Sequence, residues 1–206
     1  MTTMRVETQD SHPPRPGRLR TLALIAMVAL ASGCGYESSP DASTSTPAAP
    51  DPVGQPDPAE VVDIWTPAAM GEVATLKARL AKAGDPNALD PTFGVSALEW
   101  AADFGQVGAM TAILEAGGNV DVRSRERGTP LIGAAFLGRP ECVTLLLEAG
   151  ADPKAKNKDG ITPLDALDVP WEFTRGVIEF LQIPLDREVL EAGRQACRPL
   201  LEEAVR

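Results

Sequence analysis

The sequence predicts an all-α solenoid, in which helix-turn-helix units stack on one another with short hairpin loops between them and a capping helix at the C-terminal end. Two observations predict this fold. The dipeptide Ala-Gly recurs at residues 83–84, 116–117 and 149–150, a period of 33 residues. Each period contains two short helix patterns separated by a glycine, Gly105 in one unit and Gly138 in the next. A unit of this size cannot bury its apolar face alone, so the units must stack.

The two central units span residues 94–127 and 128–159. In the second of them Thr129 precedes Pro130. A threonine side chain caps free helical N–H groups, and proline suits the first helical position, so we expect the first helix to begin at Pro130. The second helix is expected to end before Gly150, with this glycine in the left-handed conformation that often ends helices.

The terminal units are less regular, as is usual for repeats that turn one face to water. We expect about four repeats over residues 60–183, with an N-terminal unit at 61–90 and a C-terminal unit that starts at Gly160. Residues 184–206 are predicted to form the capping helix, with Asp186 as its N-terminal cap. Its apolar stripe consists of Val189, Leu190, Gly193, Cys197, Leu200 and Leu201.

Short motifs in these units resemble those of a known family. Gly128-Thr129-Pro130-Leu131 and Gly160-Ile161-Thr162-Pro163-Leu164 are similar to the G-x-TPLH motif of the ankyrin repeat, and Gly150-Ala151-Asp152 is similar to its GAD motif. The histidine of TPLH, which is structural in that family, is replaced by Glu99, Ile132 and Asp165. The resemblance covers roughly residues 61–183. It implies that a protein partner docks on the concave face, which hairpin tips and the exposed sides of the first helices form.

The first 33 residues resemble a bacterial lipoprotein signal peptide. Four arginines precede the uncharged apolar run 21–32, which is shorter than the about 20 residues that a membrane-spanning helix needs. The run closes on Leu30-Ala31-Ser32-Gly33-Cys34, which resembles the lipobox of these proteins. The resemblance implies cleavage before Cys34 and acylation of its thiol. The alternative is an ordinary secretory signal in which Cys34 is incidental.

Residues 34–59 are predicted to form a disordered tether, because this stretch of Pro, Ser, Thr and Asp contains almost nothing apolar to bury. The protein is therefore expected to be exported and held to a membrane by lipid at Cys34, facing the periplasm or the cell exterior. Gly35, rather than an aspartate, follows the cysteine. By resemblance to lipoproteins of double-membrane bacteria, this favours the outer membrane.

Composition and charge exclude several classes of protein. The net charge of −10 argues against a nucleic-acid partner, because phosphate binding needs clustered Lys and Arg. The single histidine, His12, lies in the predicted signal peptide, so the mature chain has no imidazole for Ser-His or Cys-His catalysis or for the usual zinc sites. No Gly-rich phosphate loop, EF-hand or HExxH motif is present. We therefore expect no enzyme activity, no cofactor and no metal ion.

Two pairs of residues are candidates for chemistry. Glu99 and Asp103 stand four apart on one helix and form a candidate carboxylate pair. We favour two solvated acids on an exposed helix face, since this spacing arises by chance in an acidic chain. Cys142 and Cys197 could form a disulfide in an exported protein. We favour two buried thiols, because two helix layers are expected to separate them.

The candidate partner-binding residues follow from the concave face that the resemblance implies. They lie at hairpin tips, where basic residues alternate along the hairpin arms, and at the ends of first helices. The first group consists of Phe93, Asp103, Phe104, Phe136 and Leu137. The basic group consists of Arg123, Arg125, Lys156 and Lys158. Trp100 is expected in the core, and the basic tips are equally well explained as solvated side chains that nearby acids neutralise.

The leading hypothesis is a membrane-anchored binding protein that contacts another protein of the bacterial cell envelope through its concave face. A monomer is expected. The alternatives are an immunity or inhibitor protein against an exported toxin or enzyme, an envelope hydrolase that uses Glu99 and Asp103, and a structural spacer without a specific ligand. The repeat indicates the class of protein but does not name a partner.

Overall fold

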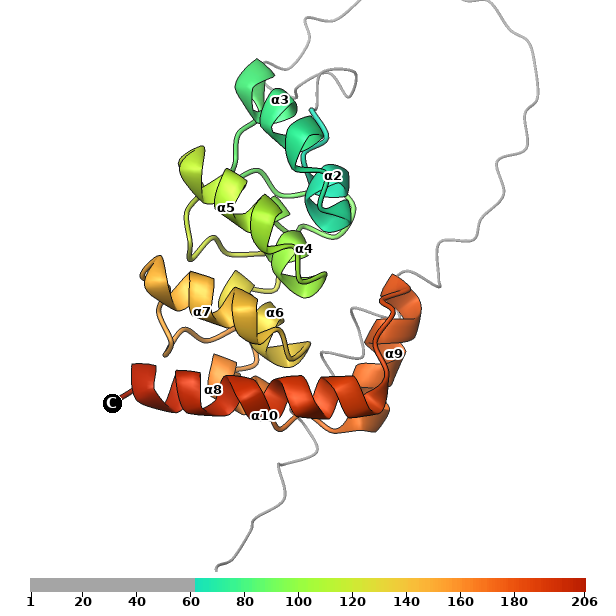
Figure 1. The fold of residues 1–206 in the computed structure, drawn as a ribbon, viewed down its shortest axis with the longest axis vertical. Helices are drawn as coiled ribbons and strands as arrows, with labels where there is room; N and C mark the ends of the chain where they lie inside the picture. The colour runs from blue at the N-terminus through green and yellow to red at the C-terminus, as the bar shows by residue number, and fades with distance from the viewer. Residues whose placement is uncertain (1–61) are drawn as a thin grey trace, which may run out of the picture. The chain divides into compact units, whose positions relative to one another are not determined.

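The structure is a computed structural model that describes residues 62–206 (Figure 1). Within these residues it contains nine α-helices and, in place of strands, one isolated β-bridge between Leu89 and Ser96. The predicted all-α repeat fold is confirmed. The predicted signal peptide, Cys34 and the tether lie outside the described residues. From residue 62 onward no helix has both the length and the apolar character that crossing a bilayer requires.

The helices form two rows. Successive helices of the first row contact one another, as do successive helices of the second row. The first row consists of α2 (Trp65–Met70), α4 (Ala97–Asp103), α6 (Pro130–Phe136) and α8 (Pro163–Ala166). The second row begins with α3 (Val73–Ala83), α5 (Val107–Glu115) and α7 (Pro140–Glu148). Each pair α2–α3, α4–α5 and α6–α7 is one helix-turn-helix unit.

Hydroxyl side chains cap the first helices at the 33-residue period. Ser96 Oγ accepts a hydrogen bond from Glu99 N at 3.1 Å, and Thr129 Oγ1 accepts one from Ile132 N at 3.3 Å. Thr162 repeats the arrangement one unit later. Thr129 is the predicted cap, and the helix begins at Pro130 as expected. The caps recur because each unit has unpaired backbone N–H groups at the start of a first helix, and these groups need a hydrogen-bond acceptor.

Hairpins of neighbouring units are joined through the backbone and through short polar side chains. Arg125 N donates to Gly94 O at 2.8 Å, and Lys158 N donates to Glu126 O at 3.1 Å. Asp121 Oδ1 in turn accepts from Asp152 N at 3.1 Å. These contacts link residues about one period apart, so each hairpin holds the next in register.

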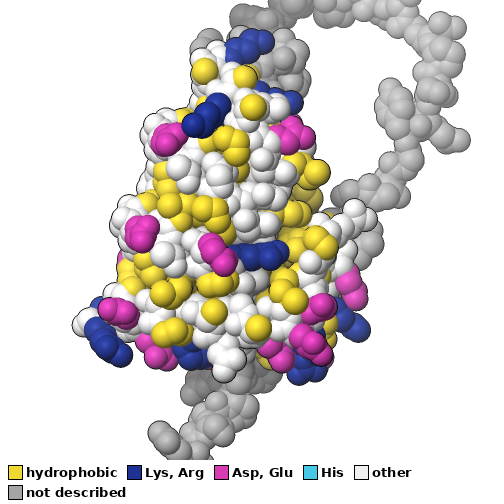
Figure 2. Space-filling view, in the orientation of Figure 1, with side chains coloured by type: hydrophobic (Ala, Val, Ile, Leu, Met, Phe, Trp, Pro, Cys, Tyr) yellow, Lys and Arg dark blue, Asp and Glu magenta, His cyan; other side chains and the backbone are white. Residues whose placement is uncertain are grey.

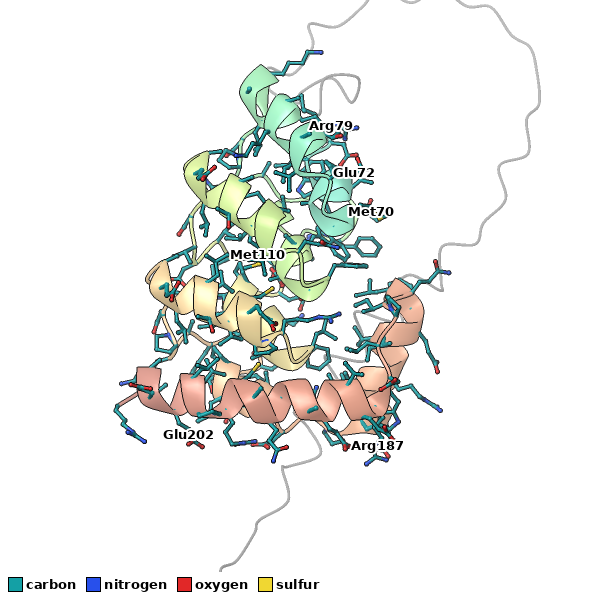
Figure 3. All side chains as sticks on the ribbon, in the orientation of Figure 1. Met70, Glu72, Arg79, Met110, Arg187 and Glu202 are labelled. Carbon is teal, nitrogen blue, oxygen red and sulfur yellow. The ribbon has the colours of Figure 1, made fainter. Side chains whose placement is uncertain are left out.

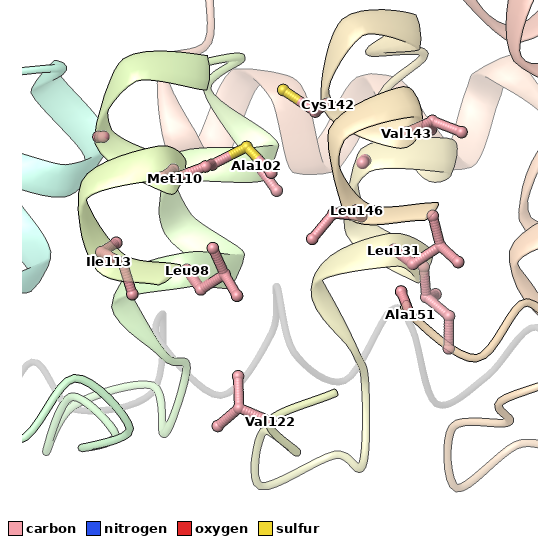
Figure 4. Packing of buried hydrophobic residues seen from close by; sticks show 14 of the residues in the cluster. Leu98, Ala102, Met110, Ile113, Val122, Leu131, Cys142, Val143, Leu146 and Ala151 are labelled. Atoms are coloured by element: carbon pink, nitrogen blue, oxygen red, sulfur yellow. The ribbon is translucent and has the colours of Figure 1, made fainter. Parts of the chain in front are cut away.

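One apolar core runs through the stack (Figure 4). The close-up shows Leu146 of α7 pointing toward Leu98 of α4 and Met110 and Ile113 of α5, with Leu131 of α6 beyond it, and all five side chains are fully buried. The first helices contribute several fully buried alanines to this core, among them Ala101, Ala102, Ala134 and Ala135. Burial of this shared core is what stabilises units that have no core of their own.

The last unit departs from the regular pattern. After the four residues of α8 comes α9 (Trp171–Leu181), and then α10 (Arg187–Ala204). It is α10, not α9, that contacts α7 and α8, so α10 completes the second row. Helix α9 stands outside both rows and rises beside them from the N-terminal end of α10 (Figure 1). Pro170 accounts for the break, since its extended backbone (ψ 145°) cannot continue a helix from α8.

Helix α10 caps the core largely as predicted. Asp186 is its N-terminal cap, with Oδ1 accepting from Val189 N at 2.9 Å. Leu190, Cys197 and Leu201 of the predicted stripe are fully buried. Val189 was placed in that stripe wrongly, because its side chain is 55% exposed. Arg194 is also buried, on the side of the helix where the apolar stripe predicts no polar residue.

Cys142 and Cys197 are both free and buried, as we favoured. The expected reason was wrong: no intervening layer separates their helices, because α10 packs directly on α7. Burial raises the pKa of each thiol to about 12. Both cysteines therefore act as small apolar side chains of the core.

Candidate protein-binding surface

Aromatic side chains from separate parts of the chain gather on one side of the first row. Phe93 lies in a hairpin, Trp100 and Phe104 on α4, Phe136 at the end of α6 and Phe180 on α9. We call the four that belong to the repeats, Phe93, Trp100, Phe104 and Phe136, the aromatic surface, and Phe180 of α9 packs on it. The rings of Phe93 and Trp100 lie 5.8 Å apart at 77°, and those of Phe93 and Phe180 lie 6.2 Å apart at 82°. Such edge-to-face pairs stabilise the cluster beyond simple burial. Figure 2 shows hydrophobic side chains on this side of the molecule, between α4 and α9.

A buried aspartate positions the first two rings. Both oxygens of Asp90 are used: Oδ1 accepts from Thr92 N and from Phe93 N, and Oδ2 accepts from Val95 N. The same Oδ2 accepts from the indole Nε1 of Trp100 at 3.2 Å. Asp90 was not among the residues predicted from the sequence, although an aspartate at the start of a tight turn is a typical acceptor for the turn's N–H groups. Trp100, expected in the core, is half-buried, with its indole N–H directed to this turn.

Phe104 and Phe136 were expected to be open to a partner, and the structure corrects this. Both are half-buried against a second apolar cluster, which forms where α9 and the following loop fold back on the repeats. Leu137, also predicted to bind a partner, is buried with only 1% of its surface exposed. The cluster consists of Leu137, Ile178, Ile183, Leu185 and Leu190. The repeat pattern predicts open first-helix ends, but α9, which is no part of the regular repeat, covers them.

The basic hairpin tips are partly engaged in holding hairpins together. Arg123 Nη1 donates to Lys156 O at 2.8 Å and to Arg127 O at 3.1 Å. Lys158 forms an ion pair with Glu126. Arg125 and Lys156 remain exposed. These contacts support the view that nearby carboxylates and carbonyl oxygens engage the basic side chains of the tips. They also reduce the number of charged side chains that are free to contact a partner.

Glu99 and Asp103 lie between α4 and α6, and the expectation that they are solvated was wrong. The Glu99 carboxyl group lies beside Ser124 and Gly128 of the hairpin between α5 and α6, and a Cβ on Gly133 of α6 would overlap Asp103 Oδ1. Glu99 Oε2 is buried without a hydrogen-bond partner. Burial and the neighbouring Asp103 raise the pKa of Glu99 to about 8, and burial raises that of Asp103 to about 7 against the opposing charge of Arg139. Near neutral pH the pair therefore holds at least one proton.

The family model for ankyrin repeats, in three copies, matches residues 68–157. These residues are ankyrin repeats. No curated protein matches the chain. The matched residues run from α2 to the third hairpin, so the resemblance drawn from the TPLH and GAD motifs is confirmed for the central units. Ankyrin repeats suggest a role in protein–protein interaction. Helices α8, α9 and α10 lie beyond the matched residues.

Within the ankyrin repeats, Glu99 stands where the TPLH motif has histidine. Its side chain faces the next hairpin, which places the carboxyl group in the interface between two units rather than on an open surface. A surface cavity of about 430 Å³ opens instead between residues 167–170, the start of α9 and α10, and neither Glu99 nor Asp103 lines it. No cluster of metal-binding side chains occurs among the residues that the structure covers. The position of the pair thus suits a contact between repeats.

Proposed function

We propose that this chain is a membrane-anchored, non-enzymatic binding protein that contacts another protein of the bacterial cell envelope through the aromatic surface of its ankyrin repeats. The observation that carries the proposal is the aromatic surface itself. The rings of Phe93 and Trp100 lie 5.8 Å apart edge to face, the Phe104 ring lies 6.1 Å from that of Trp100, and none of the three residues is fully buried. Half-exposed aromatic clusters supply most of the binding energy in many protein interfaces.

The surface continues beyond the rings that α9 covers. Met70 ends α2 with 65% of its surface exposed, and Figure 3 shows it on the side of the stack that faces α9. Leu89, at the foot of the hairpin that carries Phe93, is 38% exposed. A flexible thioether beside rigid rings suits an apolar side chain of a partner. We therefore place the partner along α2, α4 and the hairpin between them.

The proposal places the ankyrin repeats outside the cytoplasm, at the end of the tether 34–59. Its support is the lipobox-like segment that ends at Cys34. Acylation adds about 0.8 kcal/mol of membrane affinity for each buried CH₂ group, so two or more acyl chains hold the protein at the membrane. Replacement of this cysteine, Cys34→Ser, should leave the precursor uncleaved before residue 34 and without lipid, as seen by mass spectrometry of the membrane fraction. Cleavage at the same bond with release of soluble protein would contradict the anchor.

Site-specific crosslinking tests the surface. A photo-crosslinkable phenylalanine analogue in place of Phe93 should crosslink a defined envelope protein in cells. The same analogue in place of Glu202, which is exposed near the end of α10 and away from the aromatic surface in Figure 3, is the matched control. The expected result is one crosslinked protein from position 93 that is missing from position 202. The same set of products from both positions, or none from either, would contradict the proposed function.

A further inference from the structure

Helix α9 is an insertion that covers part of the aromatic surface. The rows of first and second helices are complete without it, since α10 takes the place against α7 that the second helix of the last unit would occupy. Its side chains Ile178 and Phe180 lie against the repeats, with Phe104 and Phe136 packed into the same apolar cluster and Phe93 in contact with the Phe180 ring. The chain thus places its own helix on the face where we propose that a partner docks.

The base of α9 is held by a dense set of hydrogen bonds. Arg194 of α10 donates from Nη2 to Thr174 Oγ1 at 3.0 Å and from Nη1 to Val169 O at 2.6 Å. Its Nε and Nη2 also donate to Phe136 O at the end of α6, and its guanidinium carbon lies 5.4 Å from the centre of the Phe136 ring. One buried side chain therefore joins the start of α9, the last ankyrin unit and α10.

The tip of α9 is held differently. In the part of the chain that the structure describes, no hydrogen bond or ion pair joins residues 175–182 to the repeats, and Arg175 pairs with Glu179 within the same helix. The outermost contact is the edge of the Phe180 ring on Phe93, and 37% of the Phe180 surface is exposed. The helix ends at Gln182, whose φ of 54° lies in the left-handed region that disfavours residues other than glycine. The tip therefore rests on apolar contacts alone and ends in a strained turn.

We propose that α9 is a latch on the aromatic surface, which pivots at its Arg194-bound base and releases its tip from Phe93 so that a protein partner can reach Phe104 and Phe136. The inference rests on the proposed function for its partner, although the opening itself is a property of this chain. Opening the tip exposes apolar side chains, Ile178 among them, but breaks no hydrogen bond to the repeats, whereas the buried guanidinium keeps the base in place. The closed form competes with the partner, so weakening the tip raises apparent affinity by raising the fraction of open molecules.

Hydrogen exchange on the full chain tests the opening. Phe180→Ala removes the ring from Phe93 and should speed exchange of the amides in 177–182 by about tenfold, the factor that corresponds to about 1.4 kcal/mol. Exchange in α4, α6 and α10 should not change. Gly176→Ala is the matched control, because a Cβ there meets no atom within 4 Å and leaves the tip contacts intact. Unchanged exchange at the tip, or equal acceleration in α10, would overturn the latch, since α9 would then be a fixed part of the fold.

Crosslinking from position 93 tests the competition. In the Phe180→Ala background the yield of the partner crosslink should rise severalfold, and in the Gly176→Ala background it should stay at the wild-type value. A fall in yield with Phe180→Ala would overturn the latch, because Phe180 would then belong to the binding surface itself. If no variant crosslinks any protein, the proposed function fails, while the exchange experiment still decides whether the tip opens.

Discussion

Gly138 and Gly193 lie in direct backbone contact where α10 crosses the turn between α6 and α7. A Cβ on Gly193 would overlap Gly138 O, and a Cβ on Gly138 would lie 2.8 Å from Leu190 O. Gly138 also has a φ of 61°, which favours glycine at this turn independently of the contact. The close approach lets Cys197 reach the end of the main core and Leu190 reach the second apolar cluster, so two glycines from separate segments set how α10 caps the stack.

Gly193→Ala should therefore destabilise the fold. The added methyl group meets main-chain atoms that cannot rotate away, and overpacking of this kind costs about 1 to 3 kcal/mol. Urea unfolding followed by circular dichroism measures the loss. Gly176→Ala is the control, since it places the same methyl group on a helix in open space and should be neutral or slightly stabilising. Equal stability of the two variants would mean that α10 does not cross Gly138 closely in solution.

Arg127 occupies a position that suits glycine. Its φ is 59°, and the residues one period before and after it, Gly94 and Gly160, have φ values of 69° and 77°. The Arg123 bond to residue 127 goes to its carbonyl oxygen and does not need the side chain. Arg127→Gly removes the cost of a left-handed backbone at a residue with a Cβ, and this gain exceeds the extra conformational entropy that glycine has in the unfolded chain. The free energy of unfolding should therefore rise by about 0.5 to 1 kcal/mol. A chemical denaturation curve at neutral pH checks it, and a destabilised variant would show that the arginine side chain has an unrecognised contact.

Local features of the fold were predictable from the sequence, and features that depend on distant packing were not. Thr129 caps its helix and Gly150 has a φ of 88° because neighbours in the chain decide both. Whether the helix face that carries Glu99 meets water or the next hairpin depends on how the units stack. The place of Glu99 in the TPLH motif, where the family has a structural histidine, was a signal that this side chain is not on an open surface. The path of α9 was not predictable, because residues 171–181 and 187–204 are both amphipathic and only their packing decides which one covers α7.

The acid pair between α4 and α6 should make stability depend on pH. The pKa of Glu99 rises from 4.5 to about 8 on folding, chiefly through burial and then through Asp103, whose own pKa rises to about 7. The folded protein therefore binds more protons than the unfolded chain between about pH 4 and pH 8, so stability is highest at the acid side of this window and falls as pH rises through it. Among the groups that face the pair, the Ser124 hydroxyl and the Arg139 charge oppose the shift, and Asp90 adds to it.

Glu99→Gln tests this origin of the pH dependence. The amide keeps the shape of the side chain but does not ionise, so the contribution of Glu99 is lost, while burial still raises the pKa of Asp103. Urea midpoints measured from pH 4 to pH 9 should fall for the wild type and fall less steeply for the variant, in which only Asp103 of the pair still titrates, so that the variant becomes the more stable protein at pH 9. Parallel curves would show that the carboxyl group of Glu99 is solvated in solution.

Replacement of Phe136 tests whether this part of the aromatic surface is covered by α9 or open to a partner. An exposed binding residue loses affinity without losing stability when it is truncated, which is what the repeat pattern implies for this position. In the structure the ring packs against the cluster of Leu137 and Ile178 and lies under the Arg194 guanidinium. Phe136→Ala should therefore lower the free energy of unfolding by about 1 to 3 kcal/mol, less than full truncation of a buried phenylalanine because the ring is only half-buried.

Leu146→Ala provides the upper reference for that loss. Leu146 is fully buried in the main core, where the cavity left by this substitution costs about 2 to 5 kcal/mol. Urea unfolding of both variants at the same pH gives the comparison, with exchange of α9 amides as a second readout. Phe136→Ala should loosen α9 selectively, since the ring is part of the surface beneath it, whereas Leu146→Ala should lower protection throughout the repeats. A Phe136→Ala protein with wild-type stability and wild-type exchange in α9 would mean that this helix does not cover the ring, and Phe136 would then be available to a partner without any movement of α9.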